Sequence, residues 1–137
     1  MKRVIILCLT LMAFFSCSVN DDGANYSFEI LPVESVEIPS EFVLGETYPI
    51  TISYFTPSTC YAFNDFYYLK ELNERTVAPI NYVFDSNDCE NLENELTEAT
   101  FNFYVTNTGS YIFKFWQGEN DNEEDQFLTI EVPVVEL

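Results

Sequence analysis

Residues 100–116 read TFNFYVTNTGSYIFKFW, two alternating segments on either side of a polar turn. The apolar residues that occupy every second position are Phe101, Phe103 and Val105 before the turn, and Tyr111, Phe113 and Phe115 after it. A two-residue period places such side chains on one face of a β-strand. The residues at 107–110, NTGS, are typical of a turn between strands. The stretch therefore predicts two strands that bury the same face of a sheet.

The same alternation recurs in residues 47–54 and 127–135. The other expected strands are 36–43, broken at Pro39, and the pair 63–72 and 76–84, joined by a turn at Asn73-Glu74. Leu92 and Leu96 lie four positions apart, which leaves a single helical turn open within 88–99. About seven short strands predict an all-β fold with a single β-sandwich, and a small closed β-barrel is the alternative.

Residues 107–113, NTGSYIF, resemble the tyrosine-corner segment that precedes strand F of immunoglobulin-like domains. In that family the tyrosine hydroxyl bonds back to the backbone at the turn. Phe113 stands where antibody-type domains place their second cysteine, so their inter-sheet disulfide is not expected. The resemblance implies an immunoglobulin-like β-sandwich for residues 26–137, and it implies no function.

The N-terminus has the order of a bacterial secretion signal. A basic start, Met1-Lys2-Arg3, precedes the apolar run 4–15, and the small residue Ser16 precedes Cys17. The run is shorter than the roughly 20 residues that a transmembrane helix needs. Residues 14–17, FFSC, resemble the lipobox of lipoprotein signal peptides, which implies that residues 1–16 are removed and Cys17 carries lipid. A cleaved, unlipidated secretory signal is the alternative.

The residues after Cys17 are polar and acidic. Residues 18–23, SVNDDG, resemble the acidic tether of Bacteroidetes-type surface lipoproteins. This resemblance implies that residues 17–25 connect a lipid anchor in the outer membrane to a domain facing the cell surface. The alternative is a solvated spacer whose acidic residues do not act as a localisation signal.

The chain is strongly acidic, with 23 Asp and Glu, 5 Lys and Arg, and a formal net charge of −18. Such a charge repels nucleic acid, so a nucleic-acid partner is not expected. It is compatible with a solvated surface, with divalent cations or with a basic partner. Aromatic residues make up 17% of the chain, which argues against the disorder typical of acidic sequences.

Two cysteines remain after Cys17, namely Cys60 and Cys89. An even pair in an exported chain predicts a disulfide, with two free thiols as the alternative. A structural zinc site is not expected, because two thiolates without any histidine do not complete a tetrahedral set.

Catalytic signatures are absent from the sequence, and we do not expect an enzyme. The chain has no His to serve as the base of a nucleophilic triad, and only 4 Gly, none in a phosphate-binding loop. The acidic loop 118–125 is a weak calcium candidate through the oxygens of Glu119, Asp121, Glu123 and Asp125. Its alternative is an exposed hairpin loop, and no other cofactor is expected.

Trp116 is the only Trp in the chain. If Tyr111, Phe113 and Phe115 face the core, then Ile112, Lys114 and Trp116 face outward and form a candidate binding surface. A Trp covered by a loop or a neighbouring strand is the alternative. A second aromatic group, Tyr61, Phe66, Tyr67 and Tyr68, is expected in the core and rim of a central strand.

These observations predict a non-catalytic lipoprotein of the cell envelope, a binding or assembly module on the outer membrane. Its ligand could be a glycan or an envelope protein. The alternative, from a different functional class, is an inhibitor of a hydrolase whose binding loop is held rigid by the disulfide. Glycan binding predicts an exposed aromatic strip on one sheet face, whereas an inhibitor predicts a protruding loop near Cys60 and Cys89.

Overall fold

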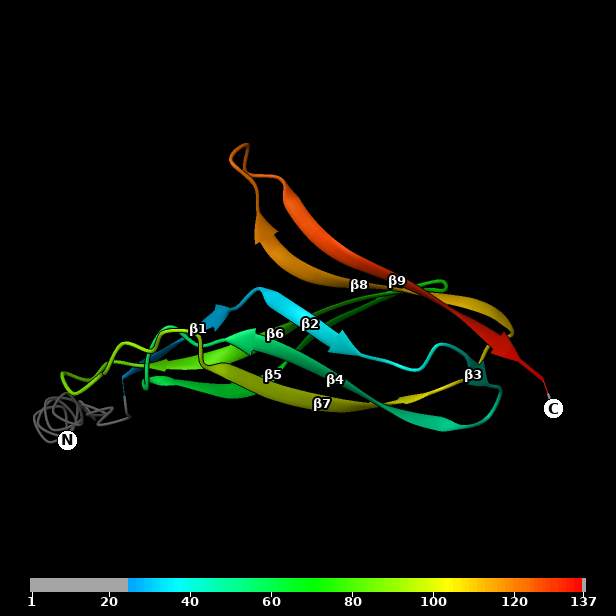
Figure 1. Cartoon of the computed structure of the whole chain (residues 1–137), viewed down its shortest axis with the longest axis horizontal. Helices are drawn as coiled ribbons and strands as arrows, with labels where there is room; N and C mark the ends of the chain where they lie inside the picture. Colours follow the sequence, from blue (N-terminus) through cyan, green and yellow to red (C-terminus); the bar gives the residue numbers. More distant parts are fainter. Residues whose placement is uncertain (1–24, 137) are drawn as a thin grey trace, which may run out of the picture.

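A computed structural model describes residues 25–136 (Figure 1). The predicted signal peptide, Cys17 and nearly all of the predicted tether lie outside these residues. The described part of the chain contains no helix that is long and apolar enough to cross a membrane. Its nine strands are β1 (Tyr26–Ile30), β2 (Val33–Glu37), β3 (Phe42–Val43), β4 (Thr47–Phe55), β5 (Tyr61–Glu71), β6 (Glu74–Phe84), β7 (Leu96–Tyr104), β8 (Gly109–Glu119) and β9 (Asp125–Val135).

The strands form two sheets packed as a sandwich, which confirms the predicted all-β fold. In the larger sheet, one edge of β6 pairs with β5. The other edge of β6 pairs with β8, which pairs with β9, and β9 pairs with β3. β1 and β8 share that second edge of β6, one after the other. The smaller sheet has the order β2-β4-β7. The strands do not close into a barrel, so that alternative is wrong.

The strand count differs from the predicted seven for local reasons. The predicted first strand breaks at Pro39 as expected, but its halves join different sheets: β2 pairs with β4, and β3 pairs in parallel with β9. β1 was not predicted. The helical turn considered within 88–99 is absent, because this part of the chain is a loop that leads into β7 at Leu96. The pairing of β6 with β8 is also parallel, unlike the antiparallel sheets of immunoglobulin domains.

The core lies between the inner faces of the two sheets. The alternation in residues 100–116 is confirmed, because Phe103, Val105, Tyr111, Phe113 and Phe115 are all buried. Ring centroids of Phe103 lie 4.8 Å from Tyr111 and 5.1 Å from Phe113, in edge-to-face contact. Such pairs add to the stabilisation that comes from burying their apolar area.

The tyrosine corner is present. The hydroxyl of Tyr111 accepts hydrogen bonds from the backbone N–H groups of Thr106, at 3.1 Å, and Asn107, at 2.9 Å. The buried guanidinium of Arg75 lies 5.0 Å from the Tyr111 ring centroid. Burial alone would raise the pKa of Tyr111, but the hydrogen bonds from Thr106 and Asn107 and the charge of Arg75 outweigh it and lower that pKa. The corner therefore fixes the turn before β8.

Candidate functional site

The outer faces of the two sheets differ in chemistry. The smaller sheet presents polar residues along its middle, and the hydroxyls of Thr51 and Thr100 hydrogen-bond there at 2.7 Å. The larger sheet presents aromatic and aliphatic residues, which we call the outer apolar face. Its most exposed large members are Tyr26, Phe28, Ile30, Tyr67, Leu69, Phe84 and Phe127, each between 39% and 57% exposed. This asymmetry singles out the larger sheet as the candidate binding surface.

A groove of about 380 Å³ lies in the outer apolar face. Its floor is formed by Thr76 and Ala78 of β6, whose short side chains leave space between longer neighbours. The residues that line it are Ile30, Tyr67, Leu69, Thr76, Ala78, Trp116, Asp125 and Phe127. The groove thus combines apolar walls from four strands with one carboxylate.

Trp116 forms part of one wall of this groove. The alternation from Tyr111 continues to Trp116 without a bulge, and the register of β8 with β9 shifts only beyond Trp116. The indole N–H of Trp116 donates to Asp125 Oδ1 at 2.7 Å. Trp116 is half-buried and faces outward, as the sequence predicts.

The other two residues of the predicted surface lie outside the groove lining. Lys114 Nζ pairs with Glu74 Oε2 at 2.6 Å, and each side chain is about one-third exposed. Ion pairs of this exposure contribute little to stability, but the pairing occupies the ammonium group. Ile112 is half-buried on the same face. The structure therefore keeps Trp116 in the candidate site and adds residues from β1, β5 and β9.

The predicted central strand around Tyr67 is an edge strand. β5 pairs only with β6, so Tyr67 and Tyr68 are both 43% exposed. The sequence carried a signal for the part of the outer apolar face that β1 forms, because Tyr26, Phe28 and Ile30 alternate with polar Ser27 and Glu29. That alternation predicts a strand, but it does not say that the apolar side faces away from the core.

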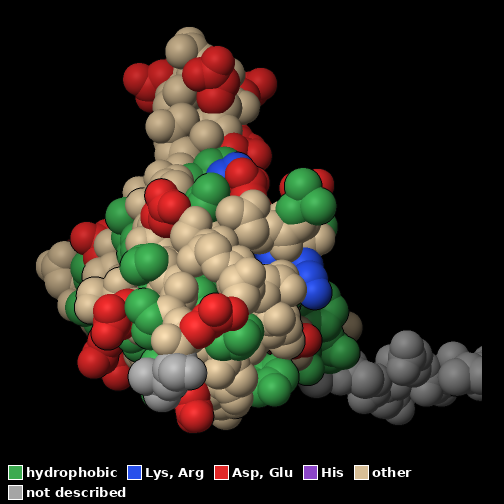
Figure 2. All heavy atoms as spheres, turned by 90° about the vertical axis from the view of Figure 1, so that its right-hand side faces the viewer, with side chains coloured by type: hydrophobic (Ala, Val, Ile, Leu, Met, Phe, Trp, Pro, Cys, Tyr) green, Lys and Arg blue, Asp and Glu red, His purple; other side chains and the backbone are tan. Residues whose placement is uncertain are grey.

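The acidic turn between β8 and β9 is a closed hairpin, and the cation site considered there is not assembled. The turn projects from the sandwich and carries its carboxylates at the tip (Figures 1 and 2). Asn120 Oδ1 accepts from the backbone N–H groups of Asn122 and Glu124, at 2.9 and 3.1 Å. Asp125 is bonded to Trp116 instead. Across residues 25–136, no group of three Cys, Asp or Glu side chains could hold a metal ion.

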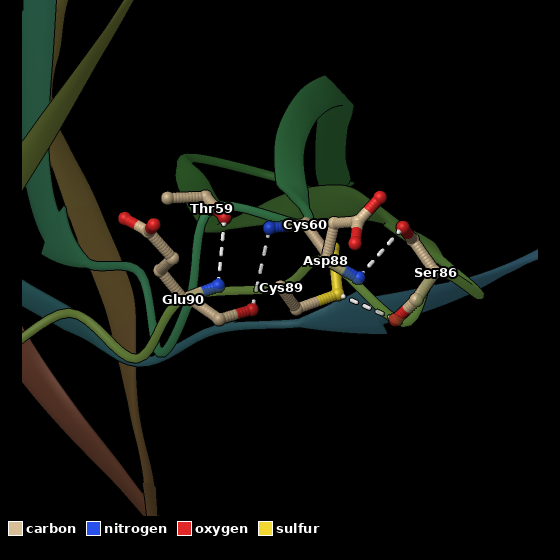
Figure 3. The surroundings of a disulfide bond; sticks show 7 residues. Thr59, Cys60, Ser86, Asp88, Cys89 and Glu90 are labelled. Atoms are coloured by element: carbon tan, nitrogen blue, oxygen red, sulfur yellow. Dashed lines mark hydrogen bonds between the residues drawn. A yellow bond between two sulfur atoms is a disulfide. The ribbon is translucent and has the colours of Figure 1, made fainter.

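Cys60 and Cys89 form the predicted disulfide, with their Cα atoms 5.4 Å apart (Figure 3). The loop that carries Cys89 is also held by hydrogen bonds. Thr59 N–H donates to Glu90 O at 2.9 Å, and Glu90 N–H donates to Thr59 Oγ1 at 3.0 Å. Further along, Leu92 N–H donates to Pro57 O at 3.0 Å. The loop next to the disulfide therefore lies along residues 57–60.

Trp116 should be quenched by acrylamide to an intermediate degree. One side of its indole lines the groove and the other packs on the sheet. The acrylamide quenching constant should therefore lie between the value for a fully buried Trp and the value for the unfolded chain. Acrylamide is the suitable quencher, because the net charge of −18 would repel iodide and imitate burial. Tyr67→Ala, which removes an opposite wall, should increase quenching. A native chain that acrylamide does not quench would contradict this placement.

Glu29→Gln should lower the pKa of Tyr61. The hydroxyl of Tyr61 donates to Glu29 Oε2 at 2.7 Å, and this bond, with burial and the negative charge of Glu29, raises the pKa of Tyr61 to about 12. Because the folded pKa lies above the unfolded value of 10.0, the stabilisation is complete below pH 10 and is lost as the pH rises through 12. The absorbance titration of the variant should show one more tyrosine ionising near pH 10. Superimposable titrations would contradict the pairing.

Comparison of the chain with protein-family models, curated proteins and solved structures finds no significant match.

Proposed function

We propose that this chain is a non-catalytic lipoprotein of the cell envelope that binds a partner through its outer apolar face. The observation that supports this proposal is the asymmetry between the sheets. The larger sheet gathers its exposed aromatic and aliphatic side chains into one outer face, whereas the smaller sheet exposes Phe55, Leu96 and Tyr104 only at the ends of the β4–β7 pair. Large contiguous apolar surfaces on soluble domains are typical of interaction sites. The absence of His from the sequence supports a binding role over catalysis.

The groove supports contact with a ring or a side chain. Its volume of about 380 Å³ lies in the range of small-ligand pockets. Trp116 and Tyr67 offer aromatic faces, and Asp125 offers a hydrogen-bond acceptor beside them. Aromatic residues dominate the energetics of many binding sites. A sugar ring of a glycan or an apolar side chain of an envelope protein would fit this combination.

An inhibitor of a hydrolase is supported less well. That role favours a protruding loop near the disulfide. The loop of Cys89 instead lies along residues 57–60, held by two backbone–backbone hydrogen bonds and by one from the Glu90 N–H to the Thr59 hydroxyl. The hairpin turn between β8 and β9 projects from the sandwich (Figure 1), and neither cysteine lies on these strands.

The proposed anchor is lipid on Cys17. The order of a basic start, an apolar run, Ser16 and Cys17 supports it. An acyl-modified cysteine would hold the mature chain at the outer membrane, and the acidic residues that follow would extend the domain toward the cell surface. Two or three acyl chains bind a bilayer far more firmly than one.

A photo-crosslinking amino acid placed at two exposed positions tests the binding surface in intact cells. Position 127 lies on the outer apolar face, and position 104 lies on the smaller sheet, where Tyr104 is 58% exposed and serves as the matched control. We expect discrete crosslinked species from position 127 and none of them from position 104. The same species from both positions, or none from position 127, would contradict the proposal.

A further inference from the structure

The orientation of β1 is inverted relative to an ordinary sandwich strand. Its polar residues Ser27 and Glu29 point toward the side of the other sheet, whereas Tyr26 and Phe28 point away from it. All five residues of β1 are exposed. Tyr26 and Phe28 are 50% and 57% exposed, so burial in the core does not account for two aromatic residues at these positions.

Four aromatic side chains gather at this end of the outer apolar face. Tyr26 pairs across the strands with Phe84, and Phe28 pairs with Tyr82. We call these four residues the N-terminal aromatic cluster. The Tyr82 centroid lies 5.1 Å from Tyr26 and 5.2 Å from Phe28, and 5.8 Å from the stacked ring of Phe84. The cluster shares no residue with the lining of the groove at Trp116.

The cluster lies where the chain enters the domain. Figure 1 places β1 at the N-terminal end of the molecule and the C-terminus at the opposite end. Cys17 precedes Asn25 by eight positions, a length that spans at most about 29 Å when fully extended. A lipid on Cys17 would therefore keep Asn25, which precedes the cluster directly, within that distance of the membrane interface.

We propose that the N-terminal aromatic cluster contacts the surface of a zwitterionic bilayer and acts as a second attachment beside the lipid. This inference rests on the lipid anchor of the proposed function. Tyr rings suit the membrane interface because one end is apolar and the hydroxyl end remains hydrated, and the Phe rings add apolar area. Stable attachment commonly combines an acyl chain with a second signal. Asp85 borders the cluster, so the expected contact is with acyl chains and zwitterionic head groups rather than with anionic ones.

A tryptophan reporter at two positions tests this contact. The full chain carrying Phe28→Trp and Trp116→Phe is purified from membranes and reconstituted into phosphatidylcholine vesicles with brominated acyl chains. The control carries Tyr104→Trp and Trp116→Phe, which places the reporter on the other sheet, remote from β1. We expect a blue shift and a loss of emission for the reporter at position 28, and unchanged emission at position 104.

The two proposals fail in distinguishable ways. If the chains do not stay on the vesicles, the lipid anchor is wrong, and the same variants are then held by an N-terminal oligohistidine tag on nickel-chelating lipid. Quenching at position 28 alone, under either attachment, supports the bilayer contact. Equal emission with and without brominated lipid at position 28 overturns it. A photo-crosslinker at position 28 that captures a discrete protein in intact cells, together with a reporter there that brominated lipid does not quench, would also overturn it and assign the cluster to a protein partner.

Discussion

A chain with both Cys60→Ala and Cys89→Ala should lose about 3.5 kcal/mol of unfolding free energy, the largest single effect we expect. The disulfide closes a sequence separation of 29 residues, and without it the unfolded chain regains the conformational freedom of that loop. Urea denaturation followed by far-UV circular dichroism measures the loss. The backbone hydrogen bonds from Thr59 and Leu92 should keep the loop in place at low denaturant.

Reduction of the unmodified chain is the control for this result. It opens the same loop without changing a side chain, so its effect should match that of the double variant. A loss below about 1 kcal/mol in both cases would show that the disulfide adds little to a loop already held by hydrogen bonds.

Tyr111→Phe should lower the free energy of unfolding by about 2 kcal/mol, because it leaves backbone donors in the tyrosine corner without a partner. The hydroxyl accepts from the N–H groups of Thr106 and Asn107, and the ring itself is fully buried. Phenylalanine retains the ring and its contacts with Phe103 and Arg75, so the measured loss reports the hydroxyl. Urea denaturation provides the value.

Tyr104→Phe is the matched control, because it removes a tyrosine hydroxyl from a side chain that is 58% exposed. Its effect should stay within about 0.5 kcal/mol, the usual range of surface substitutions. Equal stabilities of the Tyr111→Phe and unmodified chains would mean that water replaces the hydroxyl at the corner, and the corner would not stabilise the fold.

The sheet faces buried in the core could be predicted where one side of a strand is apolar and the other polar. Residues 100–116 meet this condition, and their alternation matches the burial from Phe103 to Phe115. β1 alternates as well, but its apolar side faces solvent. Alternation alone gives the period of a strand and not the direction of its apolar side. The inverted orientation of β1 depends on pairing with β6, whose partner residues lie 50 to 58 positions later.

The groove could be predicted only at Trp116. Its other walls come from β1, β5 and β9, and the pairing of strands so distant in sequence is not encoded in any local pattern. The same holds for Lys114, which meets Glu74 across the parallel pair of β6 and β8. The acidic turn is a case in which the sequence suggested a site that the structure does not assemble, because its carboxylates are of the kind that bind cations. Hydrogen bonds within the turn to Asn120, and from Trp116 to Asp125, account for its conformation instead.

The affinity of the Trp116→Ala chain for the partner recovered by crosslinking tests the binding role of the outer apolar face most directly. We expect binding free energy to fall by about 2 kcal/mol or more, close to a thirtyfold rise in Kd, measured under conditions where urea denaturation shows the variant to be folded. Tyr104→Ala, an equally simple truncation on the smaller sheet, should bind as tightly as the unmodified chain. If Trp116→Ala and Tyr104→Ala both retain full affinity, the outer apolar face is not the binding surface.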